Sequence, residues 1–499
     1  MSFLYDNIAT LAVAALVCTF AWLFGGTRGD LLMPTIPWLL FFLAEMMICF
    51  PQRHPGEPTV EARARVWSAL RKDPLTWVSV GFLLLLLIPF LNKGLCPVCD
   101  YAEITFQGAD PKPPIPFLPY CVNRLHHLNV CLWFFPALTA MLAVKHALVG
   151  RGKRLLLEIV VWNGALLGLL GIVQTATGAK GPLWIKSMVM PGHFFSTFGY
   201  PNMAGDYFTT LFGLSIALWR WTISQDDKVG NREVRTAHKD FWLRHIMLIP
   251  ALICFFSALA TLSRAAILLT ISLAIVFILH AYASFFKKMS RLKRVRVLFA
   301  SLVAVVALVL GLILWTPRDL QREVNTLNTT EILDRVTGRQ QYHVRVATEI
   351  WKENFLFGCG GWGYKHLCIP KMTKAELRQI QMVGGINVHN DYLQFLAEHG
   401  LAGFGCLVAI VVLLVLPIGR AWNRLMKAVR FLPAKEAPPR PYAFFVLPAP
   451  VFCILLTALA TLTHAFGDCP LRSPAVLTLF FVSLAAMPGF LPYSIVEKS

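Results

Sequence analysis

The residues best suited to chemistry form the segment His389-Asn390-Asp391-Tyr392-Leu393, followed about two helical turns later by Glu398-His399-Gly400. This segment ends the longest polar interval of the chain, residues 316–400, and an apolar run begins directly after it at Leu401. Imidazole, amide and carboxylate groups beside a membrane span are energetically unfavourable unless they bind or react with a polar ligand. Because a histidine gains and loses a proton near neutral pH, His389 is a candidate general base for a hydroxyl group.

A candidate anion-binding residue lies in the predicted turn Thr261-Leu262-Ser263-Arg264-Ala265, between two apolar runs. Small side chains flank Arg264, so its guanidinium is well placed to meet an anion at the membrane surface. In the alternative interpretation the guanidinium snorkels to lipid headgroups and binds no ligand of its own.

Further polar residues stand at the ends of other apolar runs. His464, Asp468 and Arg472 follow one another at intervals of four residues in the turn between the last two runs. Cys469-Pro470 interrupts a continuous helix there, so equal spacing does not place the three on one face. They form either a structural polar network or a part of the site. Asn202, at the start of another apolar run, either caps that helix or reaches a substrate.

These residues must be positioned by a membrane bundle, because the composition is that of a polytopic α-helical membrane protein. Hydrophobic residues make up 56% of the 499 residues and charged residues 15%, whereas soluble domains have about 25% charged residues. Apolar runs long enough to span a bilayer as helices recur along the whole chain. Twelve are predicted, at residues 8–24, 31–50, 75–91, 126–149, 155–173, 203–221, 245–262, 265–286, 297–315, 401–418, 443–463 and 475–491. The predicted fold class is all-α, with one large loop, residues 316–400, between spans nine and ten.

The net charge of +19 indicates orientation rather than affinity for nucleic acid. Lysine and arginine concentrate in alternate loops, and the short loops between them hold few; the basic loops are residues 53–72, 145–154, 220–244, 287–296 and 420–440. Because basic loops stay in the cytoplasm, both termini are expected there and residues 316–400 outside. The first span lacks preceding basic residues and a cleavage site, so we expect an uncleaved anchor. Membrane lipids are expected partners, and nucleic acid is excluded.

The large loop is predicted to contain short helices joined by glycine turns. An amphipathic helix over residues 340–357 is expected to end at the glycine cluster 358–363. Thr373-Lys374-Ala375-Glu376 has the pattern of a capping box and predicts a second helix, and Gly400 is expected to stop a third. Together they form a cap over the membrane that is too small to have its own core.

Cysteines on the predicted outer side indicate a disulfide rather than a metal site. These are Cys96, Cys99, Cys121, Cys359, Cys368 and Cys469. The pair Cys96-Pro97-Val98-Cys99 has metal-ligand spacing, but a structural metal site needs four ligands and this motif supplies two. A disulfide within residues 92–125, among Cys96, Cys99 and Cys121, is therefore favoured, and its pairing is left open.

Several of these motifs together resemble the O-antigen ligase-related family. They are His389-Asn390-Asp391-Tyr392-Leu393 with Glu398-His399-Gly400, Ser263-Arg264, Tyr200-Pro201-Asn202 and Gly358-Cys359-Gly360, in a fitting order over about residues 195–415. The predicted topology, with its large loop after span nine, fits as well. The family usually has a proline three residues before Gly-x-Gly, where this chain has Phe355. The resemblance divides the chain into an N-terminal bundle (1–190), a ligase-related core (191–420) and a C-terminal two-helix segment (421–499).

The resemblance implies a glycosyltransferase of the bacterial inner membrane. Its donor would be a glycan on a polyprenyl diphosphate carrier, and its acceptor a hydroxyl group of a lipid or another glycan. His389 would be the catalytic base, while Arg264 and one loop arginine would hold the diphosphate. The loop arginine is Arg339 or Arg345; six helical residues turn the chain by about 600°, so the two point to nearly opposite sides. Arg345 has Glu349 four residues later as a surface partner, which favours Arg339.

Asn390, Asn202, His464 and Asp468 are expected to support this site. The chain lacks the Asp-x-Asp or clustered acidic-histidine motifs of metal-dependent transferases, so we expect no metal and no cofactor. The site should be a cleft lined by His389, Arg264 and the loop arginine, with His389 within about 15 Å of Arg264.

Two kinds of alternative function remain. Within the enzyme class, a glycan polymerase or a protein O-oligosaccharyltransferase would use the same donor chemistry. A flippase or transporter for lipid-linked oligosaccharides is the non-enzymatic alternative. Transporters usually carry ionisable groups at mid-membrane and show repeated halves. Here Glu45 is the clearest mid-span charge and no repeat is apparent, which favours an enzyme.

Overall fold

The computed structural model describes residues 2–92, 98–100, 105–107, 115–185, 193–229, 243–286, 342–377, 386–430 and 447–491. Within these ranges the regular secondary structure is helical apart from one short antiparallel ladder, β1 (Val98–Asp100) with β2 (Thr105–Gln107). The long helices are α1 (Ser2–Trp22), α2 (Gly29–Cys49), α3 (Thr59–Lys72), α4 (Pro74–Leu87), α5 (Arg124–Leu142), α6 (Gly150–Ala176), α7 (Pro201–Val229), α9 (Leu248–Ala260), α10 (Arg264–Phe286), α16 (Asp391–Arg430), α17 (Ala449–Gly467) and α18 (Pro474–Ala486).

The helices are those of a multi-pass membrane protein. Seven of the described helices are long and apolar enough to cross a membrane, or eight if the bent pair α3–α4 forms one span. Two shorter apolar helices cover Asp6–Trp22 and Pro474–Phe490. Helices are present at eleven of the twelve predicted spans, and the ninth, residues 297–315, lies outside the described residues. The total of twelve spans and their orientation therefore stay predictions.

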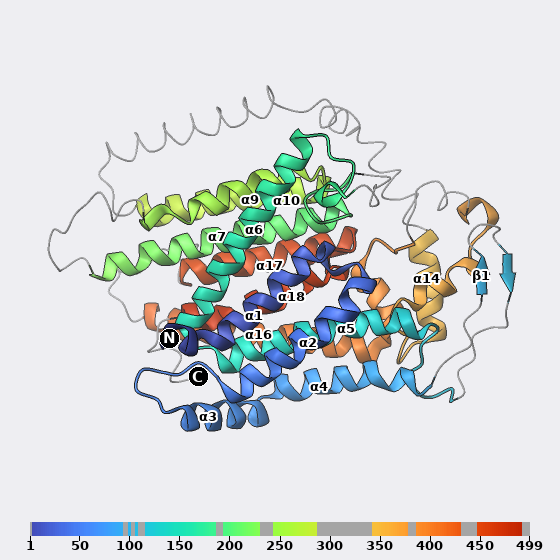
Figure 1. The fold of residues 1–499 in the computed structure, drawn as a ribbon, viewed down its shortest axis with the longest axis horizontal. Coiled ribbons are helices and arrows are strands. Elements are labelled where there is room, and N and C mark those ends of the chain that lie inside the picture. The colour runs from blue at the N-terminus through green and yellow to red at the C-terminus, as the bar shows by residue number, and fades with distance from the viewer. Residues whose placement is uncertain are drawn as a thin grey trace.

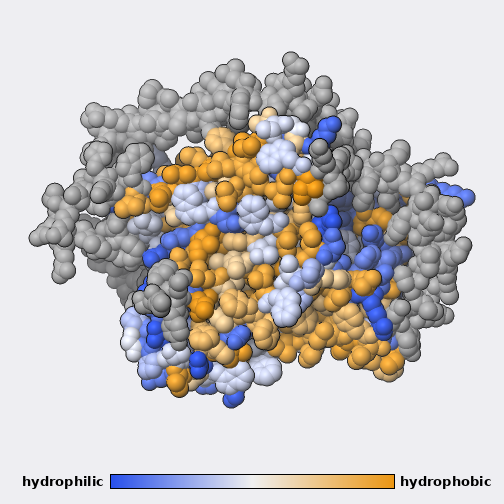
Figure 2. Space-filling view, in the orientation of Figure 1, coloured by the Kyte–Doolittle hydropathy of each residue, from blue (hydrophilic) through white to orange (hydrophobic). Residues whose placement is uncertain are grey.

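The long helices run side by side along the long axis of the molecule, with α14 (Gly363–Leu367) and β1 at one end (Figure 1). On the face of the bundle shown in Figure 2, apolar side chains cover most of the coloured surface, and hydrophilic residues gather toward the ends of the helices. Trp38 and Phe41 of α2, for example, are 76% and 67% exposed, which suits contact with lipid. Inside, helices from all three predicted parts of the chain share one hydrophobic core, and every residue of α18 is buried. The division into three parts stays a prediction.

We call the described part of residues 342–400 the cap segment. It contains a helix at residues 342–353, α14, a helical turn at 374–377 and the start of α16. The capping box is confirmed: the Thr373 amide donates to Glu376 Oε2 (2.7 Å), and the Glu376 amide donates to Thr373 Oγ1 (3.3 Å).

The packing of the cap segment agrees with the prediction that it is too small to form a core by itself. A separate apolar cluster lies inside it, built on Val346, Ile350 and Tyr364. Tyr120 and Val122, from the loop before α5, are part of this cluster. The cap segment is too short to bury these side chains alone, and a distant loop supplies the missing apolar surface.

The disulfide expected within residues 92–125 stays a prediction, because the side chains of Cys96 and Cys99 lie outside the described residues. The Cys121 thiol is buried, and Sγ donates to the carbonyl of Pro89 (3.3 Å), in the short helical turn after α4.

Candidate active site

The cap segment is joined to its membrane span by a break in α16 at Gly400. This residue has φ 62° and ψ −172°, a backbone conformation that essentially only glycine adopts. In an unbroken helix the amides of Leu401 and Ala402 would donate to the carbonyls of Ala397 and Glu398. At the break all four groups bond to another segment instead.

The partner is the loop at residues 355–360. The Leu401 and Ala402 amides donate to the carbonyls of Phe355 and Leu356 (both 2.9 Å). In return, the amides of Cys359 and Gly360 donate to the carbonyls of Ala397 (3.1 Å) and Glu398 (2.8 Å). The Gly-x-Gly and Glu-x-Gly motifs are therefore two halves of one structural unit. Phe355 takes part through its carbonyl, which a proline would supply equally well.

His389 stands at the start of the helix that this unit fixes. Its φ is +54°, a left-handed conformation that is uncommon for a residue other than glycine. Asn390 caps the helix, since its Oδ1 accepts from the Leu393 amide (3.0 Å). The Val388 amide donates to Gln394 Oε1 (3.0 Å), which holds the preceding residue. The His389 side chain is 37% exposed and therefore accessible to a ligand.

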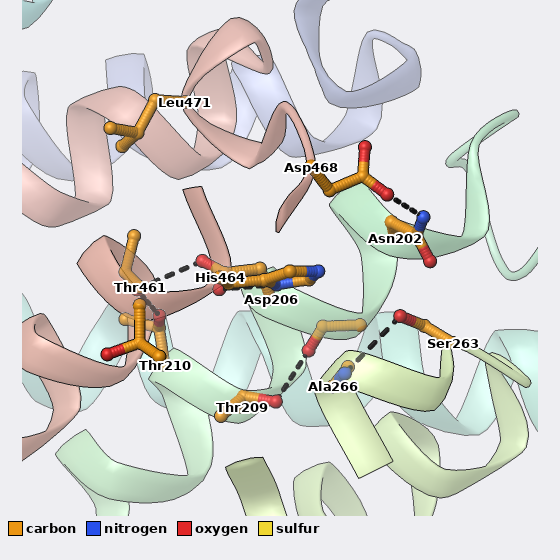
Figure 3. A network of polar contacts seen from close by, with 12 residues as sticks. Asn202, Asp206, Thr209, Thr210, Ser263, Ala266, Thr461, His464, Asp468 and Leu471 are labelled. Atoms are coloured by element: carbon orange, nitrogen blue, oxygen red, sulfur yellow. Dashed lines mark hydrogen bonds and ion pairs between the residues drawn. The ribbon is translucent and has the colours of Figure 1, made fainter. Parts of the chain in front are cut away.

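Asp468, in the turn after α17, is the partner of His389. Its carboxylate lies 3.3 Å from His389 Nδ1 and accepts hydrogen bonds from the Tyr200 hydroxyl (3.1 Å) and the Asn202 amide group. The Asn202 side chain therefore holds this carboxylate and does not cap α7 (Figure 3). Burial alone would raise the pKa of Asp468. The hydrogen bond and charge of His389 and the charge of His464 outweigh that effect, and the pKa lies below its usual value.

A second histidine–carboxylate pair lies deeper in the bundle. His464 Nδ1 of α17 is 3.0 Å from Asp206 Oδ1 of α7, and the Thr461 hydroxyl donates to the other oxygen of Asp206 (3.0 Å) (Figure 3). His464 and Asp206 are both 1% exposed. This pair ties α17 to α7 just below the Asp468 contacts. Of the two roles predicted for His464, the structural one is supported by these contacts.

Arg472 connects the same turn to the cap segment. Its guanidinium donates to Glu398 (2.6 Å), lies 3.7 Å from Asp391 and packs on the rings of Trp362 and Phe395. Only 1% of this side chain is exposed, so the two carboxylates provide the compensation that a buried cation requires. Because Asp391 and Glu398 lie at opposite ends of the helix from 391 to 399, one arginine holds the whole helix against the turn.

Arg264 is the first residue of α10 and lies beside the start of α7. Ser263 caps α10 through the Ala266 amide (3.4 Å), and a Cβ placed on Gly205 would lie 3.0 Å from Ser263 Cβ (Figure 3). Gly205 is less than one turn from Asn202, which contacts Asp468. The start of α7 thus lies beside Ser263, which precedes Arg264, and also contacts Asp468, the partner of His389. That Arg264 and His389 lie within about 15 Å of each other stays a prediction.

The two loop arginines are placed differently. Arg345 is 44% exposed and pairs with Glu349 (3.1 Å) and Glu376 (3.2 Å), so the expected surface partner is present. Arg339 lies outside the described residues. The contacts of Arg345 leave Arg339 as the favoured ligand of an anion.

The structure adds residues that the sequence did not nominate. Asp206 belongs to a recognisable pattern, an acid one turn into an apolar helix, but its histidine partner is 258 residues away. Tyr200 and Glu398 belonged to the motifs without an assigned role. His389 Nδ1, Asp468 and the thiol of Cys469 also lie within 4.8 Å of one another, a donor set capable of holding a metal ion.

The arrangement is suited to removing a proton from a bound hydroxyl. When His389 Nδ1 donates to the Asp468 carboxylate, Nε2 becomes the acceptor, and the carboxylate stabilises the imidazolium that forms. The starts of α7 and α10 lie at this end of the bundle, and helix starts favour anions. A base and an anion-binding end therefore lie together at the edge of the apolar bundle.

The comparison with known families agrees with this geometry. The family model described as O-Antigen ligase matches residues 249–408, which include α9, α10, the cap segment and the break at Gly400. No curated protein matches the chain. The residues of α7 and the turn after α17 lie outside the matched range, although they complete the site. The match identifies an O-antigen ligase domain at residues 249–408 and supports the resemblance to the O-antigen ligase-related family.

Proposed function

We propose that the protein is a metal-independent glycosyltransferase of the O-antigen ligase type. It transfers a glycan from a polyprenyl diphosphate carrier to a hydroxyl group of a lipid or another glycan, on the outer face of the bacterial inner membrane. The observation that carries the proposal is the accessible His389 of the O-antigen ligase domain, paired with the buried carboxylate of Asp468 from outside the matched range.

His389 acts on the acceptor. Its Nε2 takes the hydroxyl proton while the acceptor oxygen attacks the anomeric carbon of the donor sugar. The bond from that carbon to the carrier oxygen breaks, and the polyprenyl diphosphate leaves with the electron pair. Asp468 holds the ring and stabilises the imidazolium, and Tyr200 and Asn202 hold Asp468. Asn390 supports the reaction by capping the helix that carries the base.

Arginines act on the leaving group. Negative charge accumulates on the departing diphosphate, and a guanidinium fork stabilises it through two parallel hydrogen bonds. We assign this role to Arg264 and to a loop arginine. Arg345 is held by two carboxylates, so Arg339 is the better candidate. His464 and Asp206 fix α17 to α7 beneath the site rather than touching the donor.

One observation favours a transporter as the second candidate. The Asp206–His464 pair is buried between two membrane helices, and ionisable groups in spans often mark transport pathways. Purified protein in detergent distinguishes the two, because there is no second compartment to which a substrate could be moved. Glycan transfer in detergent supports the enzyme. Donor binding with no transfer to any lipid, glycan or protein acceptor supports the transporter.

The test of the mechanism is the substitution His389→Asn. Asparagine tolerates the left-handed backbone at this position, so the fold is kept while the base is removed. We expect transfer to fall about 10²–10⁴-fold with donor affinity unchanged. His54→Asn, at an exposed position, is the matched control. Near wild-type transfer by His389→Asn contradicts the proposed role, and inhibition by EDTA that added Mg²⁺ reverses contradicts metal independence.

A further inference from the structure

The donor set at His389 differs from an ordinary hydrogen-bond network because it includes a thiol. Cys469 Sγ lies 3.3 Å from Asp468 Oδ1, the same oxygen that lies 3.3 Å from His389 Nδ1. Among the residues that the structure describes, these three are the group whose nitrogen, oxygen and sulfur atoms gather within 4.8 Å of one another. Cys469 is fully buried, and His389 opens the group on one side.

We propose that His389, Asp468 and Cys469 bind a zinc ion, and that the bound ion inhibits transfer. Zinc binds imidazole nitrogen, carboxylate oxygen and thiolate sulfur at about 2.0–2.3 Å in a tetrahedron. The edges of such a tetrahedron are about 3.3–3.7 Å long, as follows from those bond lengths. The spacings of 3.3 Å to Asp468 already match these edges, so small side-chain rotations complete the site.

The surroundings of the group suit zinc better than magnesium or calcium. Those two ions prefer oxygen ligands in larger numbers, whereas a nitrogen–oxygen–sulfur set selects zinc. Tyr200 and Asn202 hydrogen-bond the Asp468 carboxylate, as second-layer groups do around metal-bound carboxylates. With three protein ligands, the fourth position faces the exposed side of His389 and takes water.

Inhibition follows from the overlap with the proposed base. A zinc ion on His389 Nδ1 and Asp468 occupies the contact that orients the ring and removes the carboxylate that stabilises the imidazolium. The thiol proton is released to solvent when the sulfur binds. The binding half of this inference is independent of the proposed function, and only the inhibition rests on it.

Cobalt(II) is the probe for binding. The full-length protein in detergent is freed of metal with a chelator and titrated with Co²⁺. We expect one ion per chain, with the near-ultraviolet absorption of a cobalt–thiolate bond, displaced by Zn²⁺ but not by Mg²⁺. Cys469→Ser should remove this absorption and weaken zinc binding at least about tenfold. Cys368→Ser, a buried cysteine of the cap segment outside the group, should change neither. Persistence of the absorption in Cys469→Ser, or equal competition by Mg²⁺, overturns the site.

The transfer assay separates this inference from the proposed function. Zn²⁺ should inhibit the wild type at the concentration at which it binds, whereas the transfer rate of Cys469→Ser, compared with its own metal-free rate, should not change at that concentration. Thermal unfolding of Cys469→Ser without metal checks that the variant is folded. Zinc bound without inhibition overturns the overlap with the base. Absence of transfer in every protein, with the cobalt absorption intact, refutes the transferase and leaves the zinc site standing.

Discussion

Replacement of Gly400 by alanine should uncouple the cap segment from its membrane span. The added Cβ would collide with the Leu356 carbonyl, and an alanine at φ 62° and ψ −172° is strained by about 1–3 kcal/mol. Four backbone hydrogen bonds join the two segments at this point, each worth about 1 kcal/mol. If half of them are lost, the local free energy of opening falls by about 3–5 kcal/mol. This corresponds to hydrogen exchange faster by about two to four orders of magnitude.

Hydrogen exchange at the amides of Cys359, Gly360 and Leu401 measures this effect directly. Gly405→Ala is the matched control, because it lies on the same helix and a Cβ there meets no heavy atom within 4 Å. We expect the control to exchange like the wild type or slightly more slowly, since alanine favours helix. Transfer should fall in Gly400→Ala because His389 loses its fixed position. Equal exchange in Gly400→Ala and Gly405→Ala would refute the account of the break.

Three further predictions concern charge, orientation and pH. Arg264→Ala should weaken donor binding and transfer together, and Arg264→Lys should restore only part, because a point charge cannot replace a guanidinium fork; full rescue by lysine would contradict the bidentate contact. A cysteine at the exposed Lys374 should react with a membrane-impermeant reagent in intact cells, and labelling only after lysis would reverse the predicted orientation. Burial, with His126 at 2.8 Å and the charge of Lys365, holds the pKa of His366 at about 4. The neutral His366 side chain therefore contributes fully to the free energy of unfolding above about pH 6.5, and this contribution is lost toward pH 4. By pH 5 the loss is about 2 kcal/mol. Hydrogen exchange in the cap segment that stays the same between pH 7 and 5, after correction for intrinsic rates, would contradict this prediction.

The helices and the central motif were predictable because local patterns determine them. Long apolar runs have few alternatives to membrane helices. Residue types alone also predict that a helix starts after His389-Asn390 and ends at a glycine. The pairing of residues 355–360 with 397–402 was not predictable. Glycines indicate that an unusual backbone conformation is possible, but they do not indicate which segment the backbone will hydrogen-bond. Arg472 is buried against Glu398, which is 74 residues away in the chain. The spacing of Arg472 from His464 and Asp468 therefore gave no indication that it holds the cap segment against the turn.

Spacing could not settle the pairing of the cysteines within residues 92–125 for a related reason. Cys121 lies near Cys99 along the chain, but spacing does not determine the direction of a side chain in an irregular loop. Tertiary contacts decide it, and the thiol of Cys121 points toward the Pro89 carbonyl. The disulfide stays a prediction that rests on the expected outer location of this loop.

The burial of α18 affects how the protein is assembled during synthesis. This helix follows all the other described α-helices in the chain, yet every one of its residues is buried, and it packs against α1, α5 and α7. The helices made earlier must therefore stay separated, or separate again, until α18 has been inserted. Asp468 and Arg472 enter with the same hairpin, so His389 acquires its partner only after the preceding spans are in the bilayer. A nascent chain thus exposes His389 without its partner Asp468. If His389 is the base that we propose, a chain that stops before this hairpin is expected to be inactive.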